Sequence, residues 1–289
     1  MNAKFAPLGC SNISLLGFLI LLVQAAISTV SVAGEPRPDR IRIEYAPPRN
    51  VDHQALYDLL QQRRALESLQ QIFSPFRLPG DLTLRTVGCD GVSNAWYQQS
   101  VVSVCYEYLR EIQEMAPKDT TASGITPSDA MLGQFFYVFA HEFGHAIYDL
   151  LPIPVLGTEE DAADYFSAYM MLMFGQDQAR RLIIGAGYAY SRYLANPRVT
   201  IPLVAFSGSH SPPAQRFFNL MCLAYGSDST GVFADLVDIG YLTSTRAPRC
   251  RREFNRLSFA FRELIVPHMD KERARQVLDT KWLPHALQF

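Results

Sequence analysis

The stretch from His141 to Asp164 (HEFGHAIYDLLPIPVLGTEEDAAD) concentrates groups that bind metal ions and transfer protons. On a helix, His141 and His145 project from one face about one turn apart, so both imidazoles can reach a single Zn2+ ion. Glu142 then points toward the water that the ion activates and not toward the ion itself. The H-E-x-x-H pattern therefore predicts metal-dependent hydrolysis, with His141 and His145 as ligands and Glu142 as general base.

The third ligand should come from the carboxylates that follow the proline-rich turn. A catalytic zinc site uses three protein ligands and leaves one position open. Glu160 and Asp164 form a carboxylate pair at i,i+4, so one can bind the ion while the other accepts a hydrogen bond from a ligand histidine. We predict one Zn2+ ion, with Glu160 as the third ligand and Asp164 as the support. Glu159 and Asp161 are interpreted as ordinary negative charge at a helix N-terminus.

Two helices must carry these groups. The first is predicted to begin at residue 126 or 128 and to end near 151, with apolar residues around the histidines typical of a buried helix. Prolines and a glycine then force a turn, and the second helix is predicted from 158 or 159 to 174. Gly144 weakens the first helix by about 1 kcal/mol relative to alanine, and we expect it to allow close approach of a second element.

The remaining pattern indicates an α+β fold with a small N-terminal β-sheet, an active-site helix and a mostly helical C-terminal part. With 289 residues, 48% of them hydrophobic, the chain can bury a sizeable core. We predict a single domain over 34–289, in which 34–127 holds a helix and the sheet and 128–289 is mostly helical and holds the zinc site. The predicted strands are 41–45, 82–87, 94–97 and 101–106, and the other predicted helices are 52–73, 178–195, 213–225 and 249–267.

The N-terminus is typical of a secretory signal peptide. One lysine precedes an apolar run, and small residues surround a cleavage position after Ala33. The alternative is an uncleaved membrane anchor, because the run nearly reaches the length of a short spanning helix. We expect an exported protein, periplasmic or secreted, that contacts a membrane only if the leader is retained. The formal net charge of -2 gives no reason to expect nucleic acid as a partner.

Outside the leader the chain has four cysteines, Cys89, Cys105, Cys222 and Cys250. An oxidising compartment favours two disulfides, and three pairings are possible from the sequence. The short separations favour Cys89 with Cys105 and Cys222 with Cys250. The alternative is four unpaired, buried thiols.

Several segments together resemble known zinc peptidases. HEFGH followed by EEDAAD resembles the gluzincin class, and Asn94-Ala95-Trp96-Tyr97 resembles the edge strand with which thermolysin-like enzymes bind the substrate main chain. CDGVSNAWYQQSVVSVCYEYLR, LPIPVLGTEEDAAD and QRFFNLMCLAYG resemble a bacterial family of candidate metallopeptidases, over about residues 80–265. The resemblance implies a zincin-like fold, peptidase activity, and substrate binding by Asn94 and Ala95 through strand addition. It implies no particular substrate.

His210 and Arg216 are further candidates. Their spacing, with prolines between them, is similar to a segment of membrane-linked gluzincins in which the pair lines the active site. In those proteins proline directly follows the histidine, whereas Ser211 follows it here. The resemblance implies a catalytic role for His210 toward the oxyanion and a substrate-binding role for Arg216. The alternative is a loop histidine at the entry of a helix.

The sequence thus predicts an exported zinc metallopeptidase that hydrolyses a peptide or protein substrate. A zinc-binding interaction protein without catalysis would show the same motif. A membrane-associated or intramembrane protease is the third possibility, suggested by the apolar segment 130–151, although four polar residues interrupt that segment. The oligomeric state and the cleavage preference stay open.

Overall fold

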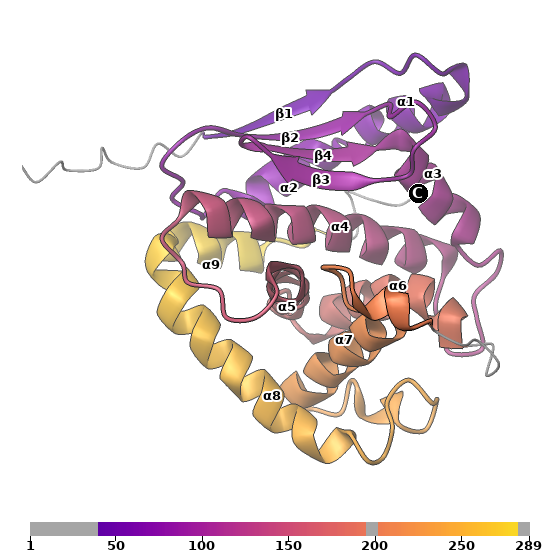
Figure 1. The fold of residues 1–289 in the computed structure, drawn as a ribbon, viewed down its shortest axis with the longest axis vertical. Coiled ribbons are helices and arrows are strands. Elements are labelled where there is room, and N and C mark those ends of the chain that lie inside the picture. The colour runs from indigo at the N-terminus through magenta and orange to yellow at the C-terminus, as the bar shows by residue number, and fades with distance from the viewer. Residues whose placement is uncertain (1–39, 195–201, 283–289) are drawn as a thin grey trace, which may run out of the picture. The chain divides into compact units, whose positions relative to one another are not determined.

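The computed structural model describes residues 40–194 and 202–282, so the proposed leader lies outside the described residues. The described part is a mixed α+β structure with one four-stranded sheet and nine α-helices. This confirms the predicted combination of a small N-terminal sheet with a mostly helical C-terminal part (Figure 1).

The sheet has the strand order β1-β2-β4-β3. Strands β1 (Ile41–Tyr45), β2 (Leu82–Val87) and β4 (Val101–Cys105) are parallel, and β3 (Ala95–Gln98) pairs antiparallel with β4. Parallel neighbours need a crossover, which helices supply between β1 and β2. One edge of the sheet is therefore the short strand β3.

The prediction of a single helix over 52–73 is wrong. The chain forms a short 3-10 turn, then α1 (Gln54–Gln62) and α2 (Ala65–Phe73), separated at Arg64. Arg64 has a φ of 51°, in the left-handed region, which ends α1 and lets α2 start in a new direction. Two helices were not predicted, α3 (Tyr106–Met115) directly after β4 and α9 (Lys271–Asp279).

Helix α4 (Pro127–Leu150) lies at the centre of the fold and carries the H-E-x-x-H motif. Thr126 caps it by accepting a hydrogen bond from the Asp129 amide, and Pro127 occupies the first helical position. Its residues from Asp129 to Gly144 are all buried, because the helix packs against strands β3 and β4 and against helices α5 and α6 (Figure 1). A helix that is buried all round can hold polar groups away from bulk water.

The other helices of the C-terminal part brace α4. Their bounds are α5 (Glu159–Leu172), α6 (Gln176–Leu194), α7 (Pro213–Ser227) and α8 (Ala247–Ala260), and α8 continues into one π-helical turn at Phe261–Ile265. Gly144 fulfils the expectation of close approach: a Cβ at this position would lie 3.2 Å from the Cα of Ala163 in α5. The two helices that carry the predicted ligands are therefore in direct backbone contact.

Replacing Gly185 with alanine should lower the stability of the protein, because the backbone of α6 touches the backbone of α4 at this point. An added Cβ would lie 1.8 Å from the carbonyl oxygen of Asp129, so a backbone must move. We expect a loss of about 3 kcal/mol in the free energy of unfolding, at the upper end for overpacking and beyond the ~1 kcal/mol gained in helix propensity. Gly187→Ala on the same helix is the matched control, since its Cβ would meet side chains and no backbone, namely the flexible end of Met221 at 2.7 Å and the ring of Phe217 at 3.3 Å. Denaturant titrations that give equal losses for both variants would contradict the backbone contact.

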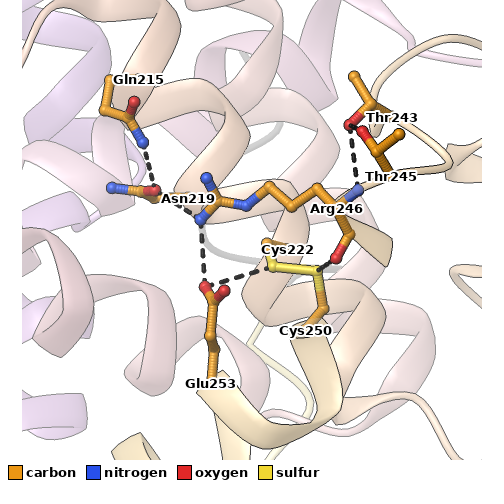
Figure 2. The surroundings of a disulfide bond; sticks show 8 residues. All are labelled: Gln215, Asn219, Cys222, Thr243, Thr245, Arg246, Cys250 and Glu253. Atoms are coloured by element: carbon orange, nitrogen blue, oxygen red, sulfur yellow. Dashed lines mark hydrogen bonds and ion pairs between the residues drawn. A yellow bond between two sulfur atoms is a disulfide. The ribbon is translucent and has the colours of Figure 1, made fainter. Parts of the chain in front are cut away.

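Both disulfides of the favoured pairing are present, Cys89–Cys105 and Cys222–Cys250. The second joins α7 to α8 where Gly226 already brings them together, since a Cβ there would lie 2.2 Å from the carbonyl oxygen of Cys250. Figure 2 shows a polar group beside this bridge, in which Arg246 contacts both Asn219 of α7 and Glu253 of α8. Helix α7 is thus fixed covalently and by packing.

The apolar segment 130–151 forms most of α4. In the part of the chain that the structure describes, no helix combines the length and the apolar character needed to cross a membrane.

Candidate metal centre

Three side chains from two helices converge at one point. Nε2 of His141 and Nε2 of His145 lie 3.3 Å apart on α4. Oε2 of Glu160, from the first turn of α5, lies 3.1 Å from the first nitrogen and 3.5 Å from the second. The predicted ligands therefore form a nearly equilateral triangle of three electron-pair donors.

The size of this triangle fits a zinc ion. Zinc binds imidazole nitrogen and carboxylate oxygen at about 2.0–2.1 Å in tetrahedral geometry, which places neighbouring ligand atoms about 3.3–3.4 Å apart. The three observed separations lie within about 0.3 Å of that value. Two imidazoles and one carboxylate are also a known donor set for catalytic zinc. The residues present thus fit one metal ion.

The outer nitrogens of both histidines face carboxylates. Oδ1 of Asp164 lies 2.8 Å from Nδ1 of His141, an ion-pair distance without the alignment of a full hydrogen bond. Oε1 of Glu159 lies 2.6 Å from Nδ1 of His145. Such contacts fix the tautomer and the ring orientation, so that each Nε2 stays available for the metal. Asp164 lies where the sequence predicts its support, whereas Glu159, interpreted as ordinary helix charge, contacts the second histidine.

Asp164 is itself held by a buried network. Arg216 of α7 donates to both of its oxygens, from Nε at 2.7 Å and from Nη2 at 2.6 Å, and the Tyr137 hydroxyl donates to Oδ1 at 2.6 Å. The Arg216 guanidinium also lies over the rings of Tyr137 and Tyr190. The contacts seen for Arg216 thus support Asp164, and direct substrate binding by Arg216 stays a prediction.

Charge and burial set the pKa values of these groups. Burial alone would lower the pKa of His141, but Asp164 and Glu160 outweigh it and raise the pKa to about 9. The hydrogen bond from His141 lowers the pKa of Glu160 to about 2, against its partial burial. Burial opposes ionisation of Asp164, yet His141 and Arg216 hold its pKa well below the usual range. Both carboxylates are therefore ionised at neutral pH.

Glu142 lies beside the triangle without forming part of it. Its side chain is buried, and burial raises its pKa while His141 and His145 lower it. The main-chain amide of Tyr97 hydrogen-bonds to the carboxyl group. A carboxyl group with a raised pKa is a stronger base once ionised, which suits proton transfer near neutral pH.

The edge strand β3 lies against this site. The carbonyl of Asn94 accepts a hydrogen bond from the Cys105 amide at 3.0 Å, and antiparallel pairing alternates, so Ala95 and Tyr97 turn their main-chain groups away from β4. Asn94 is exposed directly before the strand. The Tyr97 hydroxyl donates to Asp149 at 2.6 Å, which ties β3 to the last turn of α4. The free edge of β3 therefore faces the helix that carries Glu142.

His210 also reaches two members of the triangle, Glu160 and His141. Its Nε2 lies 2.8 Å from Oε2 of Glu160, and its ring is stacked on that of His141 with centroids 6.2 Å apart. Ser211, which takes the place of the proline found after the histidine in similar segments, donates a hydrogen bond of 2.8 Å to Asp161 of α5. The structure thus brings His210 into the metal centre.

The metal affinity of the protein should depend on pH through His141, because its proton must leave before its nitrogen can bind an ion. We expect the apparent affinity for Zn2+ to rise about tenfold per pH unit from pH 7 to about pH 9 and then to level off. Competition with a chelator of known pH dependence would measure this. An affinity that is constant over this range would contradict a raised pKa at His141.

The stability of the metal-free protein should also depend on His141, but it should fall with rising pH where the metal affinity rises. The pKa of His141 is raised on folding from 6.5, so its stabilisation is complete below pH 6.5 and is lost as the pH rises through about 9. Asp164 has a lowered pKa, so its stabilisation is present above its ordinary pKa of 3.8 and is lost as the pH falls toward its folded value. Melting temperatures of the metal-free protein across this range report both changes.

Comparison with protein-family models gives a match. A family model with the description "Putative metallopeptidase" matches residues 45–265. No curated protein and no solved structure matches the chain. The matched range begins at the last residue of β1 and ends with the π-helical turn, so it includes every residue of the metal centre.

Proposed function

This chain belongs to the family described as putative metallopeptidase, and on that premise we propose that it is an exported, zinc-dependent peptidase with a zincin-like fold. The observation that carries the proposal is the triangle of His141, His145 and Glu160, whose ligand atoms lie 3.1 to 3.5 Å apart beside the buried Glu142. A triangle of this kind leaves a fourth tetrahedral position free of these three residues.

The proposed division of labour follows from the contacts. His141, His145 and Glu160 would hold the zinc ion, which would supply Lewis-acid polarisation of a carbonyl and acidify water toward a pKa of about 7. Glu142 takes a proton from the attacking water and delivers it to the leaving nitrogen. Glu159 and Asp164 keep the two histidine rings oriented through their Nδ1 atoms.

The edge of β3 is the proposed substrate-binding element. The outward main-chain groups of Ala95 and the carbonyl of Tyr97 can pair with an extended peptide, and exposed Asn94 lies directly before the strand. Helix α4 contacts β3, and Glu142 accepts a hydrogen bond from the Tyr97 amide. A peptide added to β3 would therefore have its main chain beside the proposed base.

Cleavage of a peptide library by the purified protein tests the proposal. We expect cleavage that disappears when a chelator removes the metal and returns when Zn2+ is added in equal amount to the protein. Mass spectrometry of the products would also reveal the residue preference. Binding of one zinc ion per chain with no cleavage of any library member would remove the peptidase and leave a zinc-binding protein.

One observation favours that second function. Structural zinc sites have four protein ligands, and Nε2 of His210 lies 2.8 Å from Oε2 of Glu160, so His210 forms with Glu160 and His141 a second group that could hold a metal ion. A zinc-binding interaction protein without catalysis would use such a closed site. Whether His210 closes the site permanently therefore separates the two functions.

A further inference from the structure

The three histidines of the metal centre share one arrangement. In each, Nε2 is turned toward the same oxygen, Oε2 of Glu160, at 3.1 Å for His141, 3.5 Å for His145 and 2.8 Å for His210. In each, Nδ1 faces an oxygen of another side chain, which for His210 is the hydroxyl of Ser209 at 3.4 Å. Metal-binding histidines typically have one ring nitrogen beside an outer oxygen and the other turned toward the site.

His210 differs from the other two in how firmly it is held. Its side chain is 55% exposed, whereas those of His141 and His145 are 5% and 14% exposed. It belongs to the segment between a 3-10 turn, Leu203–Phe206, and helix α7, and not to a helix of its own. Moving the His210 ring away from the metal centre therefore exposes little further surface and breaks no regular element.

Two neighbours determine where His210 lies. Ser211 is tied to Asp161 in the first turn of α5, one residue after Glu160. Arg216, in the first turns of α7, is tied to Asp164 one turn further along α5. The hydrogen bond of Ser211 thus holds the His210 ring beside Glu160 and His141, while the Arg216 contact fixes helix α7 against α5. A proline at position 211 could not make the first of these contacts.

We propose that His210 is a fourth, exchangeable metal ligand, held in place by the Ser211–Asp161 hydrogen bond. With His210 bound, the site has three imidazoles and one carboxylate and is closed to water. With His210 displaced, the site has three ligands and one open position, and the free imidazole can donate to a developing oxyanion. The proposal deepens the proposed peptidase function, on which its catalytic consequence rests.

X-ray absorption of the zinc-loaded protein tests the closed state without any peptide substrate. We expect the wild-type protein to show three imidazoles bound to zinc, and His210→Phe to show two, with a water in place of the third. We also expect His210→Phe to bind Zn2+ at least about 10- to 100-fold more weakly, since this is the loss usually caused by removing a residue that only hydrogen-bonds to a metal ligand. His268→Phe, at a position distant in sequence and unrelated to the triangle, is the control and should change neither value.

Ser211→Ala provides a second variant that leaves all ligands in place. We expect it to lower the zinc affinity several-fold and to lower the average number of bound imidazoles, because the closed state loses its tether. If the chain is a peptidase, the same variant should cleave peptides faster at saturating zinc, since more molecules are open. A loss of affinity combined with a gain of activity is not expected for a residue that only supports the fold.

The proposal that His210 is an exchangeable ligand would be overturned, whatever the cleavage assay shows, by either of two results. One is two bound imidazoles in the wild-type protein, and the other is equal zinc affinity in wild type and His210→Phe. Three imidazoles in a protein that cleaves nothing, even as Ser211→Ala, would uphold His210 as a ligand and refute the peptidase instead. The two proposals can therefore fail separately.

Discussion

Replacing Glu142 with glutamine is expected to lower kcat/KM for peptide cleavage by about 100- to 10,000-fold, the usual contribution of a positioned general base. Glutamine keeps the size and the hydrogen-bonding reach of the side chain but cannot accept the proton. Glu142 is not one of the three converging ligands, so the zinc content per chain should stay unchanged. Steady-state cleavage and metal analysis of the same preparation measure both quantities.

Glu272→Gln is the matched control for this experiment. Glu272 lies on α9, is exposed, and pairs with Arg275 three residues along the same helix. The substitution makes the same chemical change far from the metal centre in the sequence and should leave cleavage within about twofold, as expected for a surface pair of little energetic weight. Full activity in Glu142→Gln would remove Glu142 from the mechanism, and loss of zinc would make it a ligand.

Replacing Asp164 with alanine is expected to have the largest effect on stability. Asp164 accepts two hydrogen bonds from buried Arg216 and one from Tyr137, and it also contacts His141. Removing one partner of a buried ion pair leaves the other charge uncompensated, which costs about 3–5 kcal/mol. Zinc affinity should fall about 10- to 100-fold as well, because His141 loses the group that orients its ring. Denaturant titration of the metal-free protein and zinc competition measure the two effects separately.

A second substitution tests whether the unpaired Arg216 causes the instability. Asp164→Ala combined with Arg216→Met removes the cation together with the carboxylate, so the double variant should be more stable than Asp164→Ala alone. Zinc affinity should stay low in both, since neither restores the contact to His141. Asp235→Ala is the control: Asp235 accepts two hydrogen bonds from Arg180 in similar geometry, but the two side chains are 28% and 44% exposed, so the pair should contribute at most about 1 kcal/mol.

The convergence of His141, His145 and Glu160 could be predicted largely because these residues lie close together in sequence. The i,i+4 spacing of His141 and His145 fixes their common face as soon as a helix forms. The i,i+4 spacing of Glu160 and Asp164 does the same on the next helix. The short turn between the helices leaves few ways to join the two pairs. Local geometry thus accounts for most of the centre.

The contacts missed from the sequence depend on helix packing. Glu159 reaches His145 only because α5 crosses α4 at a particular angle, and no spacing within either helix reveals that angle. Tyr137 lies one turn before His141 on α4, and its aromatic character reads as core, yet its hydroxyl donates to Asp164. The signal available in the sequence was a tyrosine one turn before His141 together with Asp164 on the second helix.

The errors in the predicted fold also arise where local sequence patterns carry no signal. The break at Arg64 has no proline or glycine to mark it, since a non-glycine residue adopts the left-handed conformation there. Helix α9 is short and strongly polar, with one buried residue, Val277, so an apolar periodicity could not reveal it. The order of the strands in the sheet could not be predicted either, because the pairing of β1 with β2 joins residues about 40 positions apart.

The backbone contact at Gly144 has a consequence for how the protein acquires its metal. The contact presses α4 against α5 over the same turns that carry the three ligands, and buried aromatic rings, Phe143 and Phe166, pack beside it. The proposed ligands are consequently held by helix packing as well as by any ion, so we expect that metal binding need not order the chain, in contrast to small zinc domains that fold only with metal. The ion could then be removed and exchanged for Co2+ or another ion of similar size in the folded protein, with the fold acting as a lasting template.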